Sequence, residues 1–109
     1  MRQHVLAAAG CLIATMAAAQ QDAKQAVDKW RACADATAAR YAKSTESALV
    51  VARLAALACA PERKQAAQAV AMQDGESFAE QYVETVEKYY VDRLAVKVIE
   101  MRLQSPEKR

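Results

Sequence analysis

The residues of this chain whose type and spacing most clearly predict chemistry are its cysteines. Residues 34–58 separate Cys33 from Cys59, and the third cysteine, Cys11, lies near the N-terminus. A redox-active dithiol is usually a C-x-x-C motif at a helix N-terminus, where the thiolate is stabilised. The much wider spacing of Cys33 and Cys59 favours a structural disulfide, with a redox-active pair as the alternative. Because disulfides persist in oxidising compartments, this prediction also concerns where the protein resides.

Other side chains that could support catalysis or hold a cofactor are scarce. The one histidine is His4, so the chain beyond it has no imidazole for a catalytic triad, a general base or a metal site. Gly75 stands alone and cannot build a glycine-rich loop that cradles phosphate. We therefore expect a non-enzymatic protein with no catalytic residue, no cofactor and no metal.

Four glutamates at helical spacing are the remaining candidates for acid–base chemistry. Paired carboxylates can transfer protons or bind calcium, but glycosidase-like catalysis needs them in a cleft with separated pKa values. A row of carboxylates along one helix is expected to face water instead. These residues are Glu76, Glu80, Glu84 and Glu87.

The overall charge does not indicate a polyanionic partner. Fifteen Lys and Arg residues stand against 13 Asp and Glu, a net charge of +2, which argues against nucleic-acid binding. Near the C-terminus the cations alternate with acids, and such a mixed face binds neither phosphate nor anionic lipid strongly. These cations are Lys88, Arg93, Lys97 and Arg102.

The first 19 residues have the three zones of a secretory signal peptide. A short basic start (residues 1–4) precedes an apolar stretch (residues 5–16) and three small residues, Ala17 to Ala19. The apolar and small residues 5–19 are too few for the ~20 that a membrane-spanning helix needs. We predict cleavage after Ala19 and export to the periplasm or the medium. Lipid attachment at Cys11, which follows a run of small residues, is the alternative.

Cleavage would leave 109 − 19 = 90 residues, and their composition predicts an all-α domain over residues 20–104. The whole chain has two glycines and two prolines and is rich in alanine, which favours helices over a many-turned β fold. Apolar and small residues recur at helical steps over residues 22–43, and Ser44 to Ser47 suit a turn and an N-cap. Residues 48–58 are apolar at every position but Arg53, so we expect this second helix to be buried nearly all round.

Two further helices complete the predicted bundle. Pro61 suits the first turn of a third helix, which should end near Gln73 with Gly75 as its C-cap. A long fourth helix follows from Ser77. Residues 94–98 also alternate like a β-strand, but one strand without a partner would leave an unpaired edge, so helix is favoured. Residues 105–109 are polar and predicted to be a disordered tail.

The cysteine positions agree with the predicted turn. In an antiparallel hairpin, paired residues are equidistant from the turn, and (33 + 59)/2 = 46 falls within residues 44–47. We therefore predict that a Cys33–Cys59 disulfide joins the first two helices in an antiparallel hairpin. Trp30, one turn before Cys33, should pack in the core beside that bridge.

The fourth helix has more apolar residues than one buried stripe can hold. The stripe consists of Tyr82, Val86, Tyr90 and Leu94, at steps of four. Neighbours such as Tyr89 and Tyr90 diverge by about 100°, so one of the two is expected on the surface. The candidate interface comprises Tyr89, Val96 and Ile99, for an unknown protein partner or a homodimer. Packing against the third helix, or single exposed side chains, is the alternative.

Part of the chain resembles a known group of proteins. The pattern Trp30-x-x-Cys33, Tyr41-Ala42 and Ala55-Ala56-x-x-Cys59-x-x-Glu62 resembles a loose set of short, exported, uncharacterised bacterial proteins over residues 27–62. This resemblance implies an exported helical hairpin with one disulfide and implies no activity. A fainter similarity links the chain to periplasmic acid-activated chaperones, which are small, helical and held by one disulfide.

These observations lead to three functional hypotheses. The first is a non-enzymatic binding or structural protein of the periplasm or cell envelope, because site chemistry is lacking. The second is an acid-stress chaperone: neutralising its 13 acids would leave the 15 − 1 = 14 cations of the mature chain to repel one another. The third is an enzyme, which would need a catalytic group that the sequence does not reveal.

Overall fold

The computed structural model describes residues 23–104, and these residues form an all-α bundle. Residues 23–41 are helical, followed by α2 (Ala48–Ala58), α3 (Ala60–Asp74) and α4 (Glu76–Gln104). Within this range no strand occurs, so residues 94–98 are helical, as favoured. The predicted signal peptide with Cys11, and the predicted tail 105–109, lie outside the described residues.

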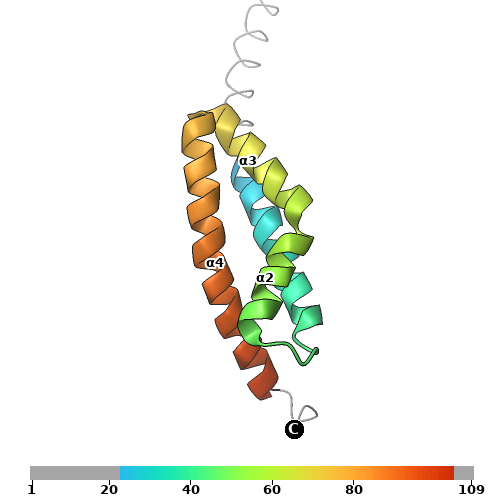
Figure 1. The fold of residues 1–109 in the computed structure, drawn as a ribbon. Helices are drawn as coiled ribbons and strands as arrows, with labels where there is room; N and C mark the ends of the chain where they lie inside the picture. The colour runs from blue at the N-terminus through green and yellow to red at the C-terminus, as the bar shows by residue number, and fades with distance from the viewer. Residues whose placement is uncertain (1–22, 105–109) are drawn as a thin grey trace, which may run out of the picture.

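The helices run up and down the bundle with short connections. Helix 23–41 and α2 form the predicted antiparallel hairpin, and α3 continues from α2 in nearly the same direction (Figure 1). α4 returns along both and packs against each of them. Only Cys59 separates α2 from α3, and only Gly75 separates α3 from α4. The bundle therefore consists of three long segments: helix 23–41, α2 together with α3, and α4. The second segment is interrupted at Cys59.

Local signals in the sequence set the boundaries of these helices as predicted. Ser47 is the N-cap of α2, and its hydroxyl accepts a hydrogen bond from the Val50 N–H at 3.3 Å. Pro61 lies in the first turn of α3, where its missing N–H is not needed. Gly75 ends α3 with a positive φ of 95°, a conformation that other residues rarely adopt.

The core is built mostly from small side chains. Trp30 is its largest member at 3% exposure, and it belongs to the same buried cluster as Cys59. Alanines at Ala38, Ala55 and Ala66 are fully buried, which permits close approach of the helix axes. Larger aliphatic residues from α2 and α4 fill the remaining space: Val51, Val83, Leu94 and Val98.

The prediction that α2 is buried nearly all round is wrong. Its inner residues, such as Val51 and Ala55, are inaccessible, but Leu57 is 72% exposed and Leu54 is also exposed. The physical reason is the size of the bundle. α2 meets helix 23–41 and α4 on one side, and nothing among residues 23–104 covers its other side.

Arg102, one of the cations of the mixed face, is bound within the bundle. Its side chain reaches the connection between helix 23–41 and α2 and donates to three backbone carbonyls there. Nε donates to the Ala42 oxygen at 2.9 Å, and Nη2 donates to the Ser44 and Glu46 oxygens at 3.0 and 2.6 Å. Arg102 thereby fastens the end of α4 to this connection.

Candidate functional site

The two cysteines of the described chain form the predicted disulfide. The Cys33–Cys59 bond has an S–S distance of 2.07 Å and a Cα–Cα distance of 6.0 Å. It joins helix 23–41 to the single residue between α2 and α3, with Thr37 Oγ1 3.6 Å from the Cys59 sulfur. A disulfide is consistent with an oxidising compartment.

Glu62 lies beside this disulfide, and the arrangement bears on metal binding. Its carboxylate and the two sulfurs lie within 4.8 Å of one another. A metal site would need thiolates, whereas here each sulfur is bonded to the other. The two cysteines therefore link the helices covalently. Glu62 lies in the first turn of α3, where a carboxylate complements the helix dipole.

The glutamates of α4 do not converge on a catalytic arrangement. Glu76, Glu80 and Glu84 are exposed, as predicted for a solvated face. Glu87 departs from that prediction, because its Oε2 accepts a hydrogen bond from Arg63 Nε at 2.8 Å. This ion pair connects α4 to α3.

Tyr90 links α4 to helix 23–41 through a half-buried polar cluster. Its hydroxyl donates to Asp35 Oδ1 at 2.6 Å, and Lys97 Nζ lies 3.2 Å from the same oxygen. Burial, together with the hydrogen bond and charge of Asp35, raises the pKa of Tyr90 well above its usual range. The guanidinium of Arg31 lies 5.8 Å from the ring centroid, within cation–π distance. The prediction that one of Tyr89 and Tyr90 faces the surface is thus confirmed, with Tyr90 on the inner side.

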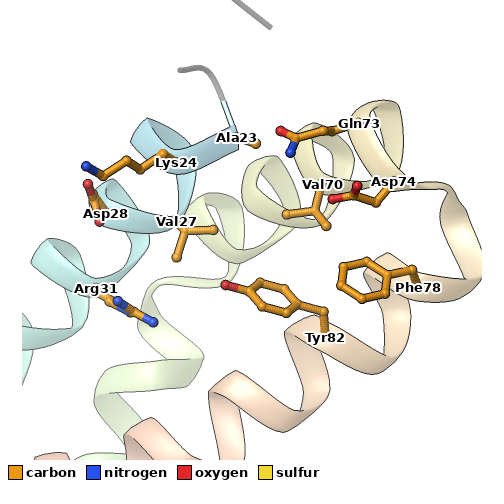
Figure 2. A pocket seen from close by; sticks show the side chains of 10 residues that line it. All are labelled: Ala23, Lys24, Val27, Asp28, Arg31, Val70, Gln73, Asp74, Phe78 and Tyr82. Carbon is orange, nitrogen blue, oxygen red and sulfur yellow. The ribbon is translucent and has the colours of Figure 1, made fainter. Parts of the chain in front are cut away.

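An open cleft of about 380 Å³ lies between the start of helix 23–41, the end of α3 and the start of α4. In Figure 2 the ring of Tyr82 extends across it toward helix 23–41, beside the Phe78 ring, whose centroid is 5.7 Å away. Two cations and two carboxylates line the cleft, so its charge selects neither an anion nor a cation. These four residues are Lys24, Arg31, Asp28 and Asp74. The cleft therefore indicates no particular ligand chemistry.

The candidate interface residues lie together on the side of α4 away from the bundle. Tyr89, Val96 and Ile99 are all at least half exposed, at 63%, 57% and 50%. Thr85 and Asp92 are exposed at intervening turns of the same side. We call these five residues the outer face of α4. Leu103 is exposed and continues the same spacing, which could have identified it from the sequence.

Arg93 borders the outer face and orients its tyrosine. Its Nη1 donates to the Tyr89 hydroxyl at 3.3 Å, and its guanidinium carbon lies 5.7 Å from the ring centroid. Tyr89 is thus an exposed aromatic whose hydroxyl still has a hydrogen to donate. Exposed aromatic and aliphatic side chains of this kind are typical of the centre of a protein interface.

No protein-family model matches this chain, and searches of curated proteins and of solved structures found no match either. Its function must therefore be inferred from its own residues. Among residues 23–104, no helix combines the length and apolar character required to cross a bilayer.

Proposed function

We propose that this chain is an exported, non-enzymatic binding or structural protein of the periplasm or cell envelope. Its contact with another protein uses the outer face of α4. The observation that carries this proposal is the cluster of Tyr89, Val96 and Ile99, which are exposed on one side of a helix whose other side is buried. Large apolar side chains grouped on a surface are the usual mark of a protein contact.

Two independent features support the assignment to an exported protein. Residues 1–19 have the zones of a signal peptide, and the disulfide is of the kind that persists outside the reducing cytosol. Intact-mass measurement of the protein from its native compartment should show loss of residues 1–19 and of two hydrogens. A mature form that begins at lipid-modified Cys11 would contradict cleavage after Ala19.

Site-specific photocrosslinking in the native cell envelope tests the contact itself. A photoreactive residue in place of Tyr89 should give defined protein adducts. The matched control replaces Met72, which is 89% exposed on α3 and lies away from the outer face. Adducts from position 89 that are missing from position 72 would support the proposal. Identical adducts from both positions, or none from position 89, would contradict it.

A chaperone that acts in acid is the second candidate, and the surface of α2 favours it. Leu49, Leu54 and Leu57 are exposed on that helix, and exposed leucines are what a chaperone presents to unfolded chains. Ion pairs of Asp35 with Lys97 and of Glu87 with Arg63 hold α4 to its neighbours, and in acid the excess positive charge of the whole chain would oppose this packing.

Dye binding and suppression of aggregation at about pH 3 and about pH 7 separate the two candidates. A chaperone of this type should bind a hydrophobic dye and suppress aggregation much more strongly at the lower pH. A protein that remains folded, does not bind the dye and is inactive in acid would eliminate this candidate.

A further inference from the structure

The residues of the outer face have the spacing of a coiled-coil seam. From Thr85 through Tyr89, Asp92 and Val96 to Ile99, the steps alternate between four and three residues. This is the 3.5-residue repeat with which two helices pack side by side. The buried residues of α4 lie on the opposite side of the helix, so a second helix could pack on the outer face while the bundle stays closed.

We propose that the outer face of α4 binds the same face of a second copy, with the two α4 helices antiparallel. This proposal rests on the proposed function, because both use the outer face of α4, and it identifies the partner as a second copy of the chain. A two-fold axis between residues 90 and 91 places Thr85 opposite Val96 of the second copy. It also places Tyr89 opposite Asp92 of the second copy. A two-fold contact of this kind uses one surface on both subunits.

Asp92 favours this orientation over a parallel one. In the antiparallel pair, its carboxylate faces the Tyr89 hydroxyl of the other copy. That hydroxyl accepts from Arg93 and keeps its own hydrogen for the carboxylate. In a parallel pair, the two Asp92 carboxylates would face each other within the seam. Like charges directly opposed at an interface disfavour that arrangement.

The contact is confined to the outer face, because Glu87, Lys97 and Arg102 of α4 are held by partners within the bundle. The outer face spans residues 85–99, about 21 Å of helix.

Light scattering of the purified, oxidised protein tests the pairing. The wild type should have twice the mass of one chain. Val96→Glu places a charge in the seam opposite Thr85 of the second copy and should halve that mass, with the helical circular-dichroism signal unchanged. Met72→Glu introduces the same charge at an exposed position of α3 and should leave the dimer intact. A wild type with single-chain mass at its highest soluble concentration overturns the proposal, as does a Val96→Glu protein that keeps the dimer mass.

Cysteine cross-linking tests the orientation with milder substitutions. Thr85→Cys mixed with Val96→Cys should form a disulfide between the two variants, because these positions oppose each other in the antiparallel pair. Cross-linking of each variant with itself would indicate a parallel pair and would overturn the antiparallel arrangement.

The two proposals can fail separately. A purified monomer, combined with a photocrosslink from position 89 to a different protein in the envelope, would overturn the second copy as partner. The same result would leave the protein-binding function of the outer face standing.

Discussion

The hairpin of helix 23–41 and α2 differs from α4 in how it is held in the bundle. The hairpin is closed by the Cys33–Cys59 disulfide and lined by buried alanines. α4 contains no cysteine and so has no disulfide to another helix. It is held by its inner apolar residues and by polar contacts of Arg102, Tyr90 and Glu87 to other helices and connections.

The hairpin with its disulfide therefore maintains the fold, whereas the outer face of α4 is available to a partner. The hairpin constrains the chain even when the bundle loosens, because a covalent bond does not depend on packing. α4 contributes one face to the core and presents another to the surroundings. Substitutions in the two regions should therefore differ in size and in kind.

Removing the disulfide should produce the largest loss of stability. The Cys33→Ala, Cys59→Ala double variant should be destabilised by ~3–4 kcal/mol, because the unfolded chain is no longer constrained by the closed loop. At ~4–8 °C per kcal/mol for a domain of this size, the melting temperature should fall by more than about 10 °C. Thermal unfolding followed by circular dichroism measures the shift. An unchanged melting temperature would mean that the bridge does not stabilise the hairpin.

Within α4, the inner and outer faces should respond differently to shortening of the side chain. Leu94→Ala should cost about 3 kcal/mol, because Leu94 is among the largest fully buried side chains and its loss leaves a cavity. Val96→Ala, two residues further on, should change the stability by less than about 0.5 kcal/mol in dilute solution. Urea titration of both variants gives the comparison. Equal losses would show that the outer face is part of the core.

Replacement of Arg102 tests how much the polar contacts of α4 contribute to stability. Arg102→Ala should cost about 2 kcal/mol, because it removes three hydrogen bonds from a charged donor to backbone carbonyls. Arg102→Lys should recover only part of the loss, since an ammonium lacks the planar fork that reaches several oxygens. Hydrogen exchange should rise first in residues 42–47. Uniform exchange across the bundle would instead indicate that Arg102 does not act locally.

Tyr90 gives the smallest expected effect, and one that depends on pH. Its pKa is raised in the folded state above the ordinary value of 10.0, so folding favours the protonated hydroxyl. The resulting stability is complete below about pH 10 and declines as the pH rises further, because only the unfolded chain then loses the proton. Tyr90→Phe should cost about 1 kcal/mol at pH 7 and should weaken this alkaline decline. Tyr89→Phe, which removes an exposed hydroxyl, is the matched control. Parallel wild-type and Tyr90→Phe stability curves above pH 10 would contradict the assignment.

The parts of the fold set by local chemistry were predictable from the sequence. Capping by Ser47, the start of α3 near Pro61 and its end at Gly75 each depend on neighbours within a few residues. The disulfide was predictable because hairpin symmetry relates two distant positions through one turn. On α4, the 3.6-residue period also separated the inner stripe from Tyr89, Val96 and Ile99.

Contacts between helices that are distant in sequence were not predictable in this way. Arg102 reaches carbonyls 56 to 60 residues away, and Tyr90 reaches Asp35 across 55 residues. No local pattern encodes these partners, because they depend on how the helices are placed against one another. The error over α2 has a similar origin: composition showed that the helix is apolar, but not how few helices would be available to cover it.

The short connections have a consequence for the survival of the protein among proteases. Among residues 23–104, residues 42–47 form the one stretch longer than a single residue that lies outside a helix. Residues 43–47 of it are exposed, and proteases cleave such exposed stretches most readily. This stretch lies between Cys33 and Cys59, so a cut there leaves the two fragments joined by the disulfide. A nicked chain should gain the mass of one water and separate only after reduction. The bundle can therefore outlast cleavage at its most accessible point.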